Sequence, residues 1–139
     1  MYYCLMLEPG ISLEQVRVVR RDDCINFLGA DVRPSLSTPS MIYWMEICCR
    51  DAILPHVGEG NDSVGIKVGV EHLAATPMGQ SVTYTAKLVA VDGRRASFEV
   101  EASDGSEVVG RGTHDRVVVD VSRFAARLRK KLEAKEAAR

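Results

Sequence analysis

One long apolar segment, residues 37–54, constrains the fold of this chain more than any other feature. It begins with a helix-start signal: Thr38 is expected at the cap and Pro39 at the first helical position, because a side-chain oxygen and an absent N–H both suit the first turn of a helix. The residues that follow form an apolar stripe: Met41, Met45, Cys48 and Ala52, widened by Trp44 and Ile53. A helix that is apolar over most of its circumference is expected to be wrapped by other structure.

Size and charge narrow the range of functions. The chain has 139 residues, of which 46% are hydrophobic, so we expect one domain over residues 1–139, with a helical tail over about 122–139. Eighteen basic side chains against nineteen acidic ones leave a net charge of −1, which argues against nucleic acid or membrane as a partner. The first residues show neither a basic leader nor a long apolar run, so a soluble, cytoplasmic protein is expected.

The four cysteines show no spacing that suits a disulfide or a metal site. They are Cys4, Cys24, Cys48 and Cys49, and adjacent helical residues point about 100° apart. We expect small buried side chains, with a reactive thiol at Cys48 or Cys49 as the alternative. No spacing resembles a zinc site or a Ser/His/Asp set, so neither a metal nor another cofactor is expected.

The residues before the apolar segment are predicted to form two strands and a loop. Residues 2–7 and 15–21 have strand-like composition on either side of the turn Pro9-Gly10. Residues 21–37, with a small apolar group of Ile25, Phe27 and Leu28, are predicted to form a loop with a short turn of helix. This loop serves either as a lid or as a simple connection. The central helix is predicted to end near Leu54-Pro55.

After the turn at residues 58–62 the apolar period changes from helical to two. The residues Val64, Ile66, Val68 and Val70 are predicted to share one apolar strand face, and His72 falls on the same face. Strands over 82–91, 94–102 and 107–121 follow, joined by the turns Asp92-Gly93 and Asp104-Gly105.

Ser122 can cap a final helix with a narrow apolar stripe of Phe124, Leu128 and Leu132. The order is therefore one buried helix followed by an antiparallel meander that needs a cover for its apolar face. An α+β hotdog fold, in which the sheet wraps around the helix, meets that need. The pattern also allows another α+β sandwich.

Three residues are the first candidates for chemistry. Glu46 interrupts the apolar helix, either as a surface acid paired with Arg50 at i+4 or as a functional carboxylate. His72 is either a satisfied core residue or a functional imidazole. For Thr38, capping the helix is a sufficient explanation on its own.

Other signals are weaker. Gly65 and Gly69 leave space in a strand for a backbone or a ligand. The segment 110–112, Gly-Arg-Gly, lacks the helix and lysine of a phosphate loop. His114 and Arg116 share one strand face, where a surface pair is expected and anion binding is the alternative.

A set of spaced motifs resembles the fluoroacetyl-CoA thioesterase-like branch of the hotdog thioesterases over about residues 35–125. The motifs are Thr38, Met45-Glu46, Gly58-Glu59-Gly60, Val64-Gly65, the segment 70–79, Gly93-Arg94-Arg95 and the segment 110–116. The resemblance implies a hotdog homodimer, or a dimer of dimers, that acts on an acyl-CoA thioester.

The resemblance also implies roles for particular residues. It places the family's functional threonine, glutamate and histidine on Thr38, Glu46 and His72, and the supporting glycine and arginine on Gly65 and Arg116. The fluoroacetate enzyme has a longer, phenylalanine-rich lid before the threonine, whereas residues 22–37 offer mainly Phe27 for contact with substrate. Selectivity for fluoroacetyl-CoA is therefore not implied, and a generic thioesterase fits better.

The implied mechanism raises a geometric question. Glu46 would activate water or attack the thioester, His72 would serve as acid or base, Thr38 would orient the reacting groups, and backbone N–H groups such as that of Gly65 would hold the oxyanion. On one straight helix, however, Thr38 and Glu46 would lie about 12 Å apart. Either Thr38 folds back on a loop or two protomers share the site. Two alternatives remain: a non-catalytic hotdog that binds a CoA ester or another apolar ligand, and a hydratase on the same fold.

Overall fold

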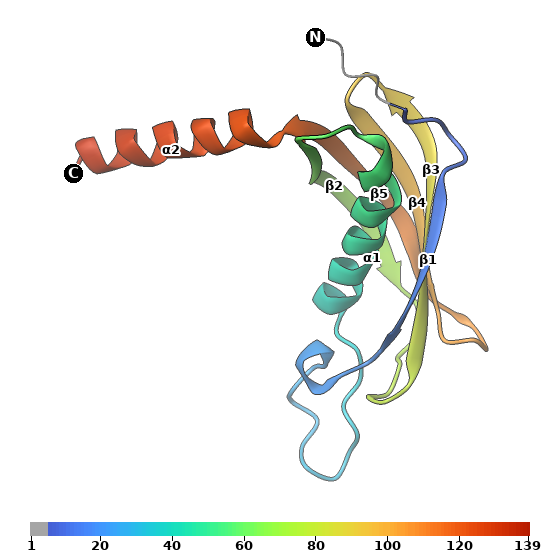
Figure 1. The fold of residues 1–139 in the computed structure, drawn as a ribbon. Coiled ribbons are helices and arrows are strands. Elements are labelled where there is room, and N and C mark those ends of the chain that lie inside the picture. Colours follow the sequence, from blue (N-terminus) through green and yellow to red (C-terminus); the bar gives the residue numbers. More distant parts are fainter. Residues whose placement is uncertain (1–5) are drawn as a thin grey trace.

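The computed structural model describes residues 6–139, in which a five-stranded sheet curves around one central helix (Figure 1). In chain order the elements are β1 Ser12–Val18, the 3₁₀ turn η1 Arg21–Asp23, α1 Thr38–Ile53, the 3₁₀ turn η2 Leu54–His56, β2 Asn61–His72, β3 Ser81–Asp92, β4 Arg95–Ser103, β5 Val108–Asp120 and α2 Val121–Ala137. The predicted helix and the four predicted strands are therefore present, and β3, β4 and β5 form a meander. The four-strand meander is wrong in one respect, because β2 pairs with β5 at the edge of the sheet and not with β3.

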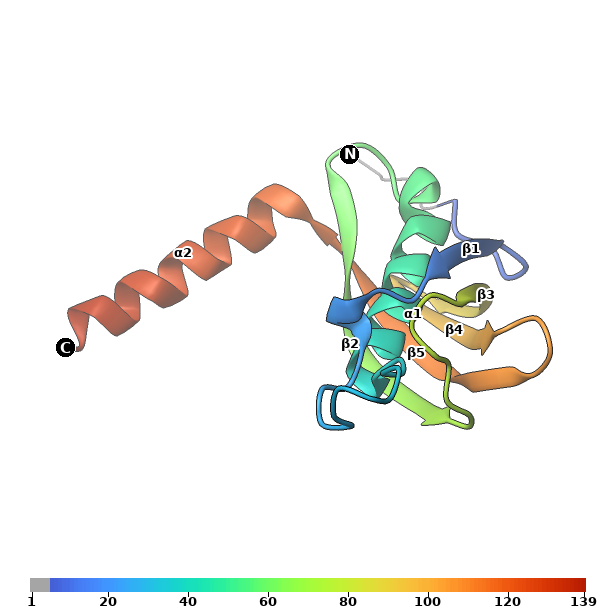
Figure 2. The ribbon, with the colours of Figure 1, turned by 90° about the horizontal axis from the view of Figure 1, so that it is seen from below.

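All strand pairs are antiparallel, and the sheet order is β1-β3-β4-β5-β2. The view along the strands shows the sheet curving around α1 (Figure 2). The predicted apolar stripe of α1 is buried, and it packs on the inward side chains of the strands, including Tyr84 and Phe98. This is the α+β arrangement expected from the sequence, with β2 as an edge strand.

The N-terminal strand prediction is only partly right. Residues 1–5, including Tyr2, Tyr3 and Cys4, lie outside the described part, and residues 6 and 7 form no strand. The next strand is β1, which begins earlier than predicted at Ser12 and stops at Val18, where its pairing with β3 ends. The chain then turns, because the backbone N–H of Arg20 donates to the Asp23 carboxylate at 3.0 Å.

The predicted alternation along β2 is wrong at its start, because a bulge interrupts the strand. The register with β5 shifts between Gly65 and Lys67, so Ile66 has no partner in the ladder. A bulge of this kind exchanges the two faces of a strand. Val68 therefore lies opposite the buried His114, whereas Val64 lies opposite Val117 on the other face. His72 shares the face of Val68, as predicted.

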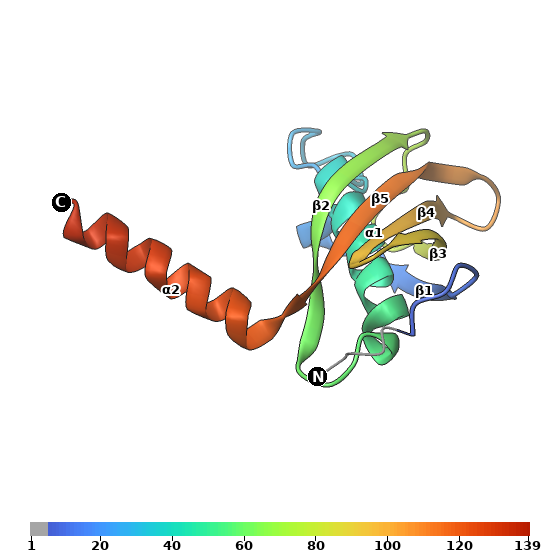
Figure 3. The ribbon, with the colours of Figure 1, turned by 90° about the horizontal axis from the view of Figure 1, so that it is seen from above.

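Helix α2 extends away from the sheet. It leaves the end of β5 and projects beyond the edge formed by β2, which is visible from opposite directions in Figures 2 and 3. Its cap is Asp120, whose carboxylate accepts the N–H of Arg123, rather than the predicted Ser122. Within residues 6–139, no helix is long and apolar enough to cross a membrane.

Candidate functional site

The first half of the candidate site joins the start of α1 to the end of β2. Ser37, not the predicted Thr38, caps the helix by accepting the N–H of Ser40. Thr38 is thus free to use its hydroxyl elsewhere, and its Oγ1 lies 2.8 Å from Nδ1 of His72. The sequence explanation of Thr38 as a simple cap is therefore wrong, because the preceding serine fills that position.

His72 has one ring nitrogen engaged and the other free. Its Nε2 is buried and has no hydrogen-bond partner within residues 6–139. Burial lowers the pKa of His72 below its ordinary value of 6.5, against a smaller opposing effect of the Ala74 backbone, so the imidazole is neutral near pH 7. Thr38 and His72 line a hollow of about 370 Å³ together with Ile25, Ser35, Leu36, Leu73, Ala74 and Ala75.

The second half of the site lies at the middle of α1. The Glu46 Oε1 atom is 3.3 Å from Nη1 of Arg116, a side chain from β5. Arg116 is 3% exposed and also donates to Ser63, at 2.7 Å to its Oγ and 2.8 Å to its carbonyl oxygen. A buried guanidinium held by this many acceptors has a fixed position. It therefore orients the half-exposed Glu46 carboxylate.

His114 completes this network from the same strand face as Arg116. Its Nδ1 lies 2.8 Å from the Lys67 carbonyl oxygen, which can only accept, so Nδ1 carries the proton. Its Nε2 therefore accepts from Arg116 Nη1 at 3.1 Å. Burial lowers the pKa of His114, and the positive charge of Arg116 lowers it further by a smaller amount. The ring is therefore neutral. The predicted surface pair of His114 and Arg116 is wrong, since both side chains are buried.

Gly65 lies directly beneath the Glu46 carboxylate. A Cβ atom at this position would overlap Glu46 Oε1 and come within 3.0 Å of His114 Cε1. The glycine thus lets the carboxylate approach the backbone of β2 next to its bulge. The surface pair between Glu46 and Arg50, one of the two alternatives for Glu46, is not formed, because Arg50 donates instead to both oxygens of Asp62, at 3.0 and 2.6 Å.

The two halves do not meet within one chain. Thr38 and Glu46 belong to one continuous α-helix, and eight residues at 1.5 Å each separate them by about 12 Å along its axis. Thr38 does not fold back toward Glu46 on a loop, because it is the first residue of α1. The structure brings Thr38 to His72 and Glu46 to Gly65 and Arg116, but it does not bring the two groups together.

The remaining candidates lie outside both halves. Phe27 is 76% exposed on the loop between η1 and α1 and is not among the residues that line the hollow at His72. Cys48 and Cys49 are fully buried, as expected, and burial raises the pKa of Cys48 to about 11 and that of Cys49 still further. Such thiols are poor nucleophiles. Cys24 is half-buried and free.

Sequence reasoning missed Ser63 and the buried role of His114. Ser63 belongs to the sequence Asn61-Asp62-Ser63, in which Asn61 is itself buried and donates to the Val57 carbonyl oxygen at 2.8 Å. The sequence does contain a pattern that indicates the burial of His114 and Arg116. They alternate with Val118, a buried residue of the same strand, and this alternation is typical of a face that meets the core.

Comparison with known proteins identifies related chains. Residues 19–122 match the model of a family described as fluoroacetyl-CoA-specific thioesterase. The fluoroacetyl-CoA thioesterase of Streptantibioticus cattleyicolor is 43% identical over 98 residues, which are 70% of each chain. A solved structure of the fluoroacetyl-CoA thioesterase FlK gives a TM-score of 0.81 at 34% identity, covering 90% of this chain and 97% of that one. A hot-dog-like protein from Thermanaerovibrio acidaminovorans, 24% identical and covering 91% and 93% of the two chains, also gives 0.81 and shows a shared fold.

Proposed function

Because the chain belongs to the fluoroacetyl-CoA-specific thioesterase family and hydrolyses an acyl-CoA thioester to the free acid and CoA, we propose that Glu46, His72 and Thr38 carry out this reaction. The observation that supports the assignment most directly is the placement of Glu46. It is a half-exposed carboxylate on a mainly apolar helix, oriented by a buried arginine and lying over a glycine. A carboxylate held in this way can act on a water molecule.

In the proposed reaction, Glu46 takes a proton from water as the water oxygen attacks the thioester carbonyl carbon. The negative charge that develops on the carbonyl oxygen needs hydrogen-bond donors. The bulge at Gly65 and Ile66 supplies candidates, since a residue outside the ladder leaves its backbone N–H available. The C–S bond then breaks and CoA leaves as a thiolate.

His72 stabilises the leaving sulfur in this scheme by donating a hydrogen bond, and the CoA thiolate then takes up the proton that Glu46 removed from water. If the Thr38 hydroxyl donates to Nδ1 of His72, the other nitrogen, Nε2, carries the proton. That nitrogen has no other partner among the described residues, so its N–H is free to donate to sulfur. Thr38 is then a positioning residue that selects the tautomer of His72.

We further propose that two protomers share each site, with Glu46 of the partner subunit facing Thr38 and His72. The edge strand β2 has half-exposed apolar side chains at Ile66 and Val68, which is unfavourable for a free edge. Two copies of β2 paired antiparallel about an axis near Val68 would place His72 opposite the partner's residue 64, beside Gly65. The Thr38 and Glu46 of one chain, about 12 Å apart, would then belong to two different sites, and each site would combine Thr38 of one protomer with Glu46 of the other.

We place the enzyme in the cytoplasm. The described cysteines Cys24, Cys48 and Cys49 are free thiols, and free thiols are typical of a reducing compartment.

The proposal is for a short acyl group and not for fluoroacetyl-CoA in particular. The hollow at His72 measures about 370 Å³, and Phe27, the main aromatic residue of the loop, does not line it. A panel of acyl-CoA thioesters of increasing chain length, with fluoroacetyl-CoA included, would rank the substrates by their kcat/KM.

The residue assignment is tested by thiol release from that panel. Glu46→Gln and His72→Ala are each expected to abolish turnover while the folded dimer persists, and Glu71→Gln, which alters an exposed carboxylate of the same sheet, is the matched control. Wild-type rates in both variants would reject the assignment. Saturable binding of acyl-CoA without thiol release would favour the non-catalytic alternative, and hydration of an enoyl-CoA without thiol release would favour a hydratase.

A further inference from the structure

Helix α2 lacks the packing that a helix of its composition requires. None of its 17 residues is buried, and the stripe residues Leu128 and Leu132 are 54% and 58% exposed. An isolated helix of this length is only marginally stable in water, and most helical stability comes from burial of an apolar face. The stripe therefore needs a surface to cover.

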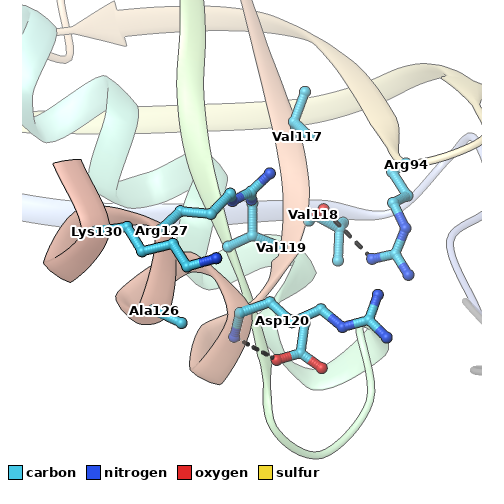
Figure 4. Close-up of a pocket in the computed structure, with 9 residues that line it drawn as sticks. Arg94, Val117, Val118, Val119, Asp120, Ala126, Arg127 and Lys130 are labelled. Carbon is cyan, nitrogen blue, oxygen red and sulfur yellow. Dashed lines mark hydrogen bonds between the residues drawn. The ribbon is translucent and has the colours of Figure 1, made fainter. Parts of the chain in front are cut away.

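The sheet of the same chain does not provide that surface. A hollow of about 560 Å³ separates the first turns of α2 from β5 and from Arg94 of the β3–β4 turn (Figure 4). The α2 side chains on this hollow include Arg127 and Lys130, which belong to the basic side of the helix. The apolar stripe lies on a different side and faces away from its own sheet.

We propose that α2 of each protomer crosses onto the partner subunit and covers the hollow formed there by Thr38 and His72. This inference rests on the proposed dimer. Helix α2 projects past β2, the edge at which the second copy would pair (Figures 1 and 3). Its 17 residues span about 25 Å, or roughly five strand spacings.

The register of the sheet places the start of α2 at the required position. The N–H of Val121 donates to the Gly60 carbonyl oxygen at 3.0 Å, and Asp120 pairs with Asn61. The first turn of α2 is therefore tied to the first residue of β2. Antiparallel pairing of two β2 strands brings Asn61 of one copy near the end of the other copy's β2, which is His72.

The surface around the partner's hollow is complementary to α2. Leu73 lines that hollow and is exposed, and the loop that lines it through Ile25 also exposes Phe27, Leu28 and Val32. The loop of residues 21–37 carries three aspartates and two arginines, whereas residues 121–139 carry seven basic side chains and two acidic ones. The apolar stripe would thus meet exposed apolar side chains, and a strongly basic helix would meet a loop of small net negative charge.

Covering the hollow would give the acyl group an apolar wall that one chain does not supply. In a single copy the hollow is open and Phe27 points into solvent. With α2 of the partner subunit over it, Phe124 and Leu128 would press the loop toward His72. The helix would then help to determine which acyl chains fit and would exclude bulk water from the thioester.

Photo-crosslinking tests the contact directly in the full chain. A benzophenone amino acid at position 128 is expected to give a covalent dimer whose cross-linked peptide maps to residues 22–37 or to Leu73. The same group at position 130, which lies about 160° from position 128 around the helix and lines the hollow against its own chain, is the control and is expected to give little covalent dimer. Cross-links within the chain alone, or to α2 of another copy, would overturn the proposal.

Kinetics separate this contact from the chemistry. Leu128→Gln is expected to raise KM for acyl-CoA about tenfold, the equivalent of losing the burial of one leucine, and to flatten the preference among acyl chain lengths. Lys130→Gln, on the side of α2 that lines the hollow against its own chain, should leave both unchanged. Light scattering should still show a dimer in both variants, because β2 forms the main interface. An unchanged KM and chain-length profile in Leu128→Gln would reject the proposal even if Glu46→Gln is inactive. An inactive wild type would instead reject the proposed reaction.

Discussion

Gly65→Ala is the substitution that should separate folding from chemistry most cleanly. The backbone at Gly65 has no positive φ, so alanine is compatible with its conformation in the strand. The added methyl group would overlap Glu46 Oε1, which is the end of a flexible side chain. The carboxylate, and not the sheet, is therefore expected to move.

The size of the effect follows from this geometry. Restoring ordinary contact with the methyl group requires a shift of the carboxylate by about 1 Å, and a misplacement of that size typically costs about 100-fold in rate. The free energy of unfolding should change by less than about 1 kcal/mol, because alanine also reduces the freedom of the unfolded chain. We thus expect kcat for thiol release to fall about 100-fold with little change in urea denaturation.

Gly69→Ala is the matched control in the same strand. Its added Cβ would lie 3.6 Å from Thr113 Oγ1, an ordinary contact, so both activity and stability should remain close to wild type. A double-mutant cycle with Glu46→Asp extends the test, since the shorter side chain withdraws from the methyl group and the two losses should not add. Wild-type kcat in Gly65→Ala, or strictly additive losses, would refute the placement of Glu46 over Gly65.

Three further predictions concern buried groups. Burial lowers the pKa of His72 below 6.5, so the imidazole stays neutral as the pH falls toward that value. The loss of kcat/KM caused by protonation of His72 should therefore occur below pH 6.5. Loss of kcat/KM through His72 above pH 6.5 would contradict the assignment. Arg116→Met removes three hydrogen bonds to Ser63 and His114 and should lower the free energy of unfolding by about 3 kcal/mol. Arg50→Met breaks only a half-exposed pair with Asp62 and should lower it by less than about 1 kcal/mol. Equal losses of unfolding free energy in urea titrations of the two variants would contradict this prediction. Cys48 and Cys49 have raised pKa values, so iodoacetamide at pH 8 should leave them unmodified in the folded enzyme, and rapid alkylation detected by mass spectrometry would show that they are accessible.

Much of the fold could be predicted because its main signals are local periodicities. The helical stripe of α1 and the turns Asp92-Gly93 and Asp104-Gly105 depend on residues that are neighbours in sequence, and the structure follows them. The bulge in β2 could not be predicted in this way. It depends on the register with β5, and the sequence shows only an apparently regular alternation of valine with glycine.

The site was harder to predict because it depends on contacts between distant residues. Glu46 stood out as one acid in an apolar helix, yet its partner lies 70 positions away at Arg116. The neighbouring Arg50 was the nearest basic residue in sequence that could pair with Glu46, but it donates its hydrogen bonds to Asp62 instead. Similarly, Ser37 and Thr38 are both good capping residues, and only the position of His72 reveals which of them has a different function.

Subunit mixing tests the shared site most directly. Glu46→Gln and His72→Ala homodimers, each inactive, are unfolded together and refolded in equal amounts, so that about half of the dimers contain one protomer of each kind. If Glu46 of one subunit faces His72 of the other, each mixed dimer has one intact site. Thiol release should then recover to about a quarter of the wild-type rate. If the mixture stays inactive although light scattering and mass spectrometry show mixed dimers, each site lies within a single chain and the account is wrong.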